Sequence, residues 1–251
     1  MTEDLRLALA LADAADEITM RSFRQSALQV RTKSDRSPVS EADEGVETMV
    51  RETLASERPA DGILGEEFGS SGSAGRRWII DPIDGTSNYI RGIPVFATLI
   101  ALAEGGRVIA SVISAPALQR RWWASSGEGS WCNGSRLRVS RVETLEESHL
   151  AYDSVTDFDR VGTADRFLKL VRRCTRARGF GDFWSHMLVA EGAIEIAIEP
   201  VVAAWDMAAV QIIVEEAGGR FSALDGSPRF DAGSGLSTNG RVHEAVLETF
   251  R

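Results

Sequence analysis

The most informative feature of this chain is a pair of carboxylates, Asp81 and Asp84, within residues 81–86, which read Asp-Pro-Ile-Asp-Gly-Thr. The apolar residues 78–80 come just before them and predict a short buried strand that ends where this turn begins. Carboxylate oxygens are ligands that Mg²⁺ prefers, and a glycine turn leading into a helix offers N–H groups to an anion. The run therefore predicts divalent cations beside a phosphate. Standing alone, it also suits a helix cap or a solvent-exposed turn.

Two further acidic residues stand at similar junctions. Glu66 follows the apolar pair at 63–64, and Asp206 opens an apolar segment that ends at Gly218. If these carboxylates converge with Asp81 and Asp84, their oxygens could hold two or three divalent ions that each keep some water. Several carboxylates are needed because the ions must also be held against a competing dianionic ester.

The elements that position these residues follow from hydrophobic periodicity and turn signals. We expect helices at 3–24, 41–57 (with Ser40 as N-cap), 163–174, 183–191 and 205–217. We expect strands at 63–64, 78–80, 98–103, 108–114, 120–124, 129–132, 150–152, 175–177, 194–198 and 220–222. Residues 26–40 read as a loop or short hairpin, and residues 69–75 as a flexible Ser/Gly loop that could close over the metals. This order predicts layered sheets between helices, with two subdomains and a cleft between them.

Bulk properties narrow the class of protein. The chain has 251 residues, 43% of them hydrophobic, which is enough for one large domain or two closely packed halves. The net charge of −9 gives no basic footprint for nucleic acid. Cys132 and Cys174 are too few for a disulfide framework, and the acidic N-terminal segment suits neither a signal peptide nor a membrane span. We therefore expect a cytoplasmic protein that binds neither nucleic acid nor membrane.

The acidic clusters also carry a resemblance to a known family. Residues 65–67, then 81–86, then Trp205-Asp206 with Glu-Ala-Gly-Gly at 216–219, resemble the signature of the inositol monophosphatase family of Mg²⁺-dependent phosphatases. The resemblance covers nearly the whole chain in the right order. It implies an α+β fold, a layered αβαβα sandwich, and a homodimer. The chain is then one phosphatase domain, 1–251, with subdomains of about 1–145 and 146–251.

The resemblance implies a role for each acidic residue at the matching position. One Mg²⁺ would be held by Glu66, Asp81 and the carbonyl of Ile83, and a second by Asp81, Asp84 and Asp206. Two or three Mg²⁺ ions per active site are expected on this basis.

The same resemblance implies the groups that act on phosphate and water. Gly85 and Thr86 would give backbone N–H groups to the phosphate of a small phosphate ester. Glu66 and Thr86, backed by Asp43, would orient and deprotonate a metal-activated water for in-line attack. Lys33 matches a basic loop residue near that site. No covalent phosphoenzyme is needed.

Selectivity should come from residues that meet the alcohol part of the ester. Residues 179–187, and the run at 91–100, resemble the histidinol-phosphate phosphatase branch of the family. In inositol-specific members the position of Asp182 is small and neutral, and Glu199 matches an acidic residue that touches substrate. Two carboxylates suit a cationic alcohol, here one with an ammonium and an imidazole group. Three neighbours are further candidates for substrate contact: Asn88, Tyr89 and Trp184.

Two alternatives stay open. The same chemistry could serve inositol 1-phosphate or another small sugar phosphate, in which case Asp182 and its aromatic neighbours have another purpose. A non-catalytic regulatory protein could also keep the fold, although the expected loss of a metal carboxylate or of Thr86 is not seen. His186 reads as a structural residue, one helical turn past Asp182.

Overall fold

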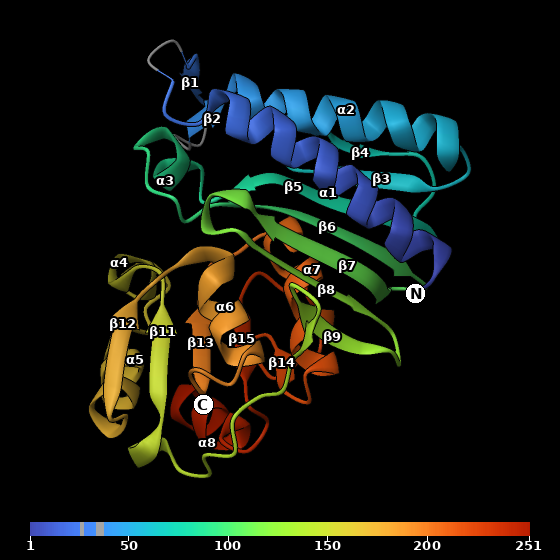
Figure 1. Cartoon of the computed structure of the whole chain (residues 1–251). Coiled ribbons are helices and arrows are strands. Elements are labelled where there is room, and N and C mark those ends of the chain that lie inside the picture. Colours follow the sequence, from blue (N-terminus) through green and yellow to red (C-terminus); the bar gives the residue numbers. More distant parts are fainter. Residues whose placement is uncertain (26–27, 34–37) are drawn as a thin grey trace.

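The computed structural model describes residues 1–25, 28–33 and 38–251 (Figure 1). Its helices are α1 (Glu3–Ser22), α2 (Glu41–Glu57), α3 (Thr86–Ile90), α4 (Val155–Arg160), α5 (Ala164–Arg173), α6 (Asp182–Ala190), α7 (Ala204–Glu216) and α8 (His243–Phe250), with short 3₁₀ turns at Pro116–Leu118 and Leu145–Glu147. Its strands are β1 (Val30–Thr32), β2 (Pro38–Ser40), β3 (Gly62–Gly65), β4 (Gly69–Ser71), β5 (Arg76–Asp84), β6 (Ala97–Glu104), β7 (Arg107–Ala115), β8 (Arg120–Ser125), β9 (Gly129–Cys132), β10 (Ser135–Arg136), β11 (His149–Tyr152), β12 (Arg176–Gly179), β13 (Ile196–Glu199), β14 (Arg220–Ser222) and β15 (Gly235–Thr238).

Two main sheets divide the chain. The first has eight strands in the order β10-β9-β8-β7-β6-β5-β3-β4, and its pairs are antiparallel except for β3 with β5. The second has five strands in the order β12-β11-β13-β15-β14, with β12, β11 and β13 parallel. The expected succession of antiparallel strands followed by βα alternation is therefore seen, and in the second sheet β15 pairs antiparallel with both β13 and β14.

Side-chain alternation along β5 and β6 explains why helices cover both faces of the first sheet. Trp78 and Ile80 belong to a buried cluster with α1 and α2, whereas Ile79 belongs to a second cluster with α6 and α7. Residues 99 and 101 of β6 follow Ile79 into that second cluster, and residues 100 and 102 face α1 and α2. A sheet that is apolar on both faces needs a helical layer on each.

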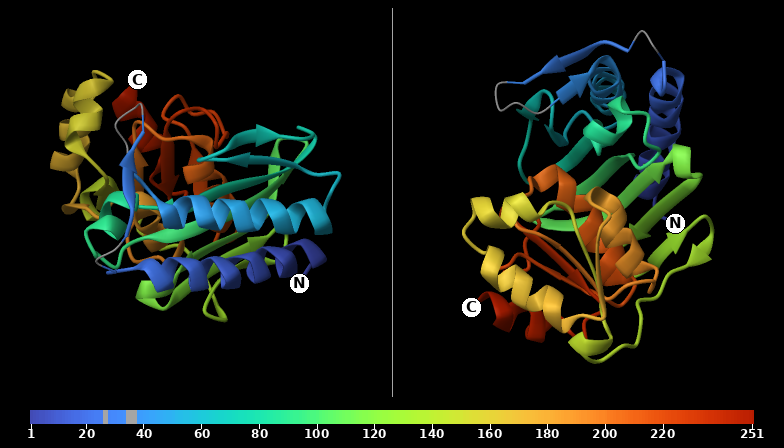
Figure 2. Two further views of the ribbon diagram at one scale, coloured as in Figure 1. Left: turned by 90° about the horizontal axis from the view of Figure 1, so that it is seen from above. Right: turned by 90° about the vertical axis from the view of Figure 1, so that its left-hand side faces the viewer.

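The second sheet is covered in the same way. Its strands share one cluster with α4, α5 and α8, and its opposite face contacts α6 through Val189. Figures 1 and 2 show the resulting stack: α1 and α2, the eight-stranded sheet, α6 and α7, the five-stranded sheet, and α5 with α8. The predicted αβαβα sandwich of α+β class is confirmed. Among the described helices, none combines the length and apolar character that crossing a membrane requires.

Two local expectations were wrong. The strand predicted at 78–80 continues to Asp84, with an irregular register between Asp81 and Asp84 opposite β6, so both carboxylates belong to the strand end itself. Residues 69–71, expected in a flexible loop, form β4, whose main chain pairs with β3. Ladder hydrogen bonds outweigh the low strand propensity of Ser and Gly there.

Other differences concern short elements. Strands β1 and β2 form a small antiparallel pair within the segment read as a loop or short hairpin; residues 26–27 and 34–37 of that segment lie outside the described residues. Periodicity did not predict α3, α4, α8, β10 or β15, because most are too short to show a repeat and α8 lies at the chain end.

Candidate active site

One pocket of about 190 Å³ gathers acidic residues from both halves of the molecule. Glu66, Asp81 and Asp84 come from the eight-stranded half, and the ends of β11 and β13 and the starts of α6 and α7 supply the other acidic residues. Seven carboxylates line it: Glu66, Asp81, Asp84, Asp153, Asp182, Glu199 and Asp206. Ile83, Gly85 and Thr86 complete the predicted metal and phosphate groups in the same lining.

The end of β5 carries the most buried of these carboxylates. Asp81 is 2% exposed, and its Oδ1 atom is buried with no hydrogen-bond partner. Burial, and then the neighbouring charges of Glu66 and Asp84, raise the pKa of Asp81 well above its usual range. Burial and the charge of Asp182 likewise raise the pKa of Asp84. A buried oxygen that accepts no hydrogen bond is costly, and a bound cation would satisfy it.

The turn after β3 is held by ion pairs. Lys33 Nζ lies 2.8 Å from Glu66 Oε1 and 2.7 Å from Glu67 Oε1. Burial acts to lower the pKa of Lys33, but the two carboxylates raise it above the usual value. Burial raises the pKa of Glu67 to about 7. Lys33 therefore stays charged and orients Glu66 at the pocket rim.

A fully buried carboxylate supports the same turn from α2. Glu47 Oε2 accepts the N–H of Glu67 at 2.7 Å, and its Oε1 accepts the N–H of Phe68 at 3.2 Å. Arg51 Nε donates to Oε1 at 2.7 Å and neutralises the charge. A Cβ on Gly65 would lie 2.0 Å from Glu47 Oε1, so only glycine leaves room for this carboxylate.

Thr86, which lines the pocket, is held by Asp43 from behind the lining. The Thr86 hydroxyl is 2.9 Å from the Ile83 carbonyl and 3.3 Å from Asp43 Oδ1. Asp43 Oδ2 accepts the N–H of Ser40 at 2.8 Å and its hydroxyl at 2.6 Å, which is a capping box at the start of α2. Burial raises the pKa of Asp43 to about 6, and the bonds from Ser40 oppose that rise. Asp43 thus fixes the Thr86 hydroxyl from behind.

Two helix N-termini bring the remaining carboxylates to the pocket. Asp206 Oδ2 accepts the N–H of Ala203 at 2.7 Å at the start of α7. At the start of α6, the N–H of Phe183 donates to Asp84 Oδ2 at 2.6 Å and ties the two halves together. Burial raises the pKa of Asp206 to about 7; burial and the charge of Asp153 raise that of Asp182 to about 8.

The donor set of the pocket meets the requirements of a hard divalent cation. It consists of hard oxygen ligands, carboxylates and the Ile83 carbonyl, which suit Mg²⁺. None of the described residues lining the pocket is Lys, Arg or His, so a phosphate dianion there needs cations from outside the chain. Within residues 1–25, 28–33 and 38–251, no three acidic, Cys or His side chains already stand in a coordinating arrangement. The residues fit Mg²⁺ in chemistry and location.

Comparison with known proteins agrees with this chemistry. The model of the inositol monophosphatase family matches residues 1–251. The chain belongs to the inositol monophosphatase family. It is 51% identical to a histidinol-phosphatase of Mycobacterium tuberculosis and 49% identical to one of Streptomyces coelicolor, and each match covers 98% of this chain and 96% of the relative. A solved structure, the extragenic suppressor protein SuhB of Bartonella henselae, has a TM-score of 0.92 at 27% identity and covers 100% of this chain and 99% of that one.

Three residues that were predicted to contact the substrate are not part of the pocket lining. Tyr89 is 1% exposed, and its hydroxyl donates to the Thr19 carbonyl at 2.8 Å among packed aromatic rings. The prediction that Tyr89 contacts substrate was wrong, because its ring completes the core. Trp184 packs beside Phe180, with ring centroids 5.1 Å apart, and serves the core face of α6.

Asn88 acts on the pocket through a neighbour. Its Nδ2 donates to Asp182 Oδ2 at 3.1 Å and to the Val95 carbonyl at 3.0 Å. Asp182 itself has a φ of 52°, in the left-handed region that non-glycine residues rarely adopt. Asn88 therefore holds a strained acidic residue in place.

Sequence reasoning missed two acidic residues near the site. Asp153 lines the pocket and directly follows β11, a strand-end position like that of Asp84, which could have identified it. Glu47 lies on the buried stripe of α2 with Val46 and Val50, and a charge at an apolar position was the available signal.

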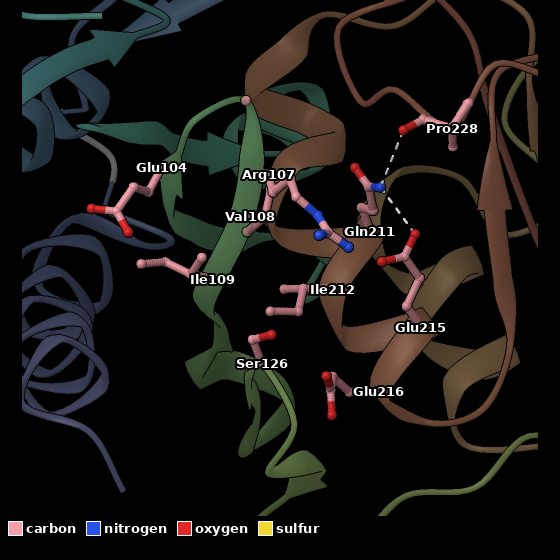
Figure 3. A pocket seen from close by; sticks show the side chains of 11 residues that line it. Glu104, Arg107, Val108, Ile109, Ser126, Gln211, Ile212, Glu215, Glu216 and Pro228 are labelled. Atoms are coloured by element: carbon pink, nitrogen blue, oxygen red, sulfur yellow. Dashed lines mark hydrogen bonds between the residues drawn. The ribbon is translucent and has the colours of Figure 1, made fainter. Parts of the chain in front are cut away.

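A larger cavity lies elsewhere in the molecule. Its volume is about 510 Å³, and it is bounded by the β6–β7 hairpin and the outer face of α7 (Figure 3). Gln211 bridges Glu215 and the Pro228 carbonyl there. It shares no lining residue with the carboxylate pocket, so cavity size alone does not locate the chemistry.

Proposed function

We propose that this chain is a histidinol-phosphatase, which hydrolyses L-histidinol phosphate to L-histidinol and phosphate in histidine biosynthesis. It is a phosphoric monoester hydrolase of a Mg²⁺-dependent family. The single observation that carries the proposal is a small pocket with seven carboxylates and no basic lining residue. Divalent cations can occupy its metal end, and the remaining carboxylates suit a cationic alcohol. Full-length relatives with this activity support the choice of substrate.

The pocket volume favours a small ester. At about 190 Å³ it lies below the roughly 300 Å³ at which drug-sized ligand pockets begin, so a nucleotide fits poorly. An inositol phosphate would fit by size, but its uncharged alcohol part would leave Asp153, Asp182 and Glu199 without a cation to balance them.

Each residue group has a defined part in the proposed reaction. Glu66, Asp81, Asp84, Asp206 and the Ile83 carbonyl hold two or three Mg²⁺ ions, which when bound acidify water and offset phosphate charge. The N–H groups of Gly85 and Thr86 bind the phosphate.

Proton transfer falls to the Thr86 side of the pocket. Thr86 and Glu66 orient the attacking water, and the Thr86 hydroxyl donates its own hydrogen to Asp43. The proton of the water passes to Glu66 or, by way of the Thr86 hydroxyl, to Asp43. Attack is in line with the leaving alcohol.

The test is phosphate release with Mg²⁺ from L-histidinol phosphate and from inositol 1-phosphate, side by side on one preparation. We expect a large preference in kcat/KM for histidinol phosphate. A preference for inositol phosphate would replace the proposed substrate and keep the metal chemistry. No Mg²⁺-dependent release from any small ester would reject the enzyme proposal and favour a regulatory role.

We also propose a cytoplasmic homodimer whose single domain has subdomains of about 1–145 and 146–251. The family resemblance supports the dimer, and the distribution of the two main sheets supports the boundary. Light scattering coupled to size-exclusion chromatography tests the dimer, because a mass near 27.3 kDa would indicate a monomer.

A further inference from the structure

One wall of the pocket, formed by Asp153, Asp182 and Glu199, contains more charge than the proposed catalysis uses. Asp153 follows β11, and Glu199 ends β13. These strands pair in parallel, with Tyr152 opposite Ile198, so the next residues, Asp153 and Glu199, are neighbours at one sheet edge. Adjacent strands lie about 4.8 Å apart, which places two like charges side by side. A binding partner with positive charge offsets that repulsion.

A buried histidine fixes one of these two carboxylates. His186 is 0% exposed; its Nε2 lies 3.2 Å from Glu199 Oε1, and its Nδ1 lies 2.7 Å from Ser237 Oγ. A carboxylate can only accept, so Nε2 carries the hydrogen, and in the neutral ring Nδ1 accepts from the Ser237 hydroxyl. His186 therefore occupies one oxygen of Glu199 and leaves the other for the pocket.

The third acidic residue of this wall lies nearer the phosphate turn. A Cβ on Gly85 would be 3.2 Å from Asp182 Oδ2, so this oxygen sits beside the turn predicted to bind phosphate. Asp153 and Glu199 lie at the ends of β11 and β13, and neither is among the three atoms nearest to that Cβ, of which the third is at 3.6 Å, so both are further from the turn than Asp182. In histidinol phosphate the ammonium is on the carbon next to the ester carbon, and the imidazole is at the far end. The order of the groups thus matches the order of the carboxylates.

We propose that Asp153 and Glu199 form the subsite for the imidazole end of the substrate, with His186 as the positioning residue of Glu199, while Asp182 faces the ammonium group. The inference rests on the proposed function and adds an assignment to each carboxylate. Two carboxylates match the two N–H donors of an imidazolium ring, which binds between them through charge-assisted hydrogen bonds.

The experiment compares L-histidinol phosphate with 2-aminopropyl phosphate, which keeps the ammonium but lacks the ring. The readout is the ratio of kcat/KM for the two esters. We expect Asp153→Asn to lower this ratio about tenfold or more, mainly through KM for histidinol phosphate. Asp159→Asn, which removes an exposed charge on α4 outside the pocket, should leave the ratio unchanged.

His186 is tested with a matched pair of variants. In His186→Gln the amide nitrogen can take the place of Nε2 and still donate to Glu199, whereas His186→Asn reaches only the position of Nδ1. We expect His186→Asn to lower the ratio of kcat/KM values as Asp153→Asn does, and His186→Gln to keep most of it. Thermal unfolding is recorded for each variant. Equal effects of Asn and Gln on the ratio would overturn the positioning role.

The outcomes separate this inference from the proposed function. If the wild-type protein does not hydrolyse histidinol phosphate, the proposed function fails and the subsite assignment fails with it. If the wild type prefers histidinol phosphate but Asp153→Asn keeps the full ratio, the subsite assignment alone is overturned. The Asp153 variant keeps the test decisive even if His186→Asn does not fold, since Asp153 is exposed at the rim.

Discussion

A single buried charge, Glu47, determines the geometry of the turn that carries Glu66. Its carboxylate accepts two main-chain N–H groups and pairs with Arg51. We expect Glu47→Gln to cost about 2 kcal/mol, because charge-assisted bonds are weakened and Arg51 loses its partner. In a chain of this size that corresponds to a Tm drop of roughly 4–8 °C. Apparent Mg²⁺ affinity should fall as well. Glu52→Gln, an exposed change on the same helix, is the control and should alter neither quantity.

The glycine beside this carboxylate gives an independent prediction. A side chain at Gly65 would place its Cβ 2.0 Å from Glu47 Oε1, and Glu47 is held too firmly to move aside. We expect Gly65→Ala to cost about 2 kcal/mol and to reduce Mg²⁺-dependent phosphatase activity. Gly75→Ala is the matched control, since its Cβ would meet only Ser73 Oγ at 3.8 Å. Equal stability of the two variants in chemical denaturation would show that the turn can rearrange.

At the scale of elements, His243 joins β14, β15 and α8. Its Nε2 lies 2.9 Å from Ser222 Oγ, and its Nδ1 lies 2.9 Å from Thr238 Oγ1. Burial lowers the pKa of His243 to about 4, below the roughly 6.5 of an unfolded histidine. In that interval the unfolded chain binds a proton that the folded chain does not, so folding stability falls as pH falls from about 6.5 to about 4.

The measurement is the unfolding free energy of the wild type and of His243→Gln between about pH 7 and pH 4. The remaining titratable groups are the same in both proteins, so their contribution cancels in the difference between the two unfolding free energies. We expect the variant to be less stable near pH 7 and the gap to narrow toward pH 4. A gap that stays constant over this range would mean that His243 is protonated with its usual pKa.

At the scale of the whole molecule, the carboxylate pocket joins the two sheets. Burial and mutual repulsion raise the pKa of Asp206 to about 7 and of Asp182 to about 8, above the roughly 4 of unfolded Asp. Between about pH 4 and pH 8 the metal-free folded chain holds protons that the unfolded chain has released. Its stability therefore falls as pH rises through this window. Mg²⁺ bound to the folded chain alone should reverse that loss.

We accordingly expect the Mg²⁺-induced rise in Tm, measured against EDTA, to grow from about pH 5 to about pH 8. Asp206→Asn should stabilise the metal-free protein at high pH, because it removes one repelling charge, and should shrink the Mg²⁺ shift. If the Mg²⁺ shift is the same at all these pH values, the carboxylates are not the proton-linked ligands.

Strong local signals explain which parts of the fold could be predicted. Helices α1, α2 and α5 have amphipathic patterns, α6 and α7 are largely apolar runs, and Ser40 with Asp43 marks the start of α2 by a capping box. Elements such as β4 and β15 have few residues and weak propensity, and they exist because a neighbouring strand pairs with them. Tyr89 illustrates the same limit, since nothing local separates a core tyrosine from one in a pocket.

The sequence by itself determined the chemistry available to this protein: the acidic residues at strand ends and helix starts, the glycine turn at Gly85, and the family to which these belong. These are local properties, fixed by residue type and spacing. Only the tertiary structure decided which groups meet across long sequence separations. It brought Glu47 under the turn of Glu66, Asp153 beside Glu199, and His186 against both Glu199 and Ser237. Such contacts depend on sheet register and layer packing, which hydrophobic pattern constrains but does not specify.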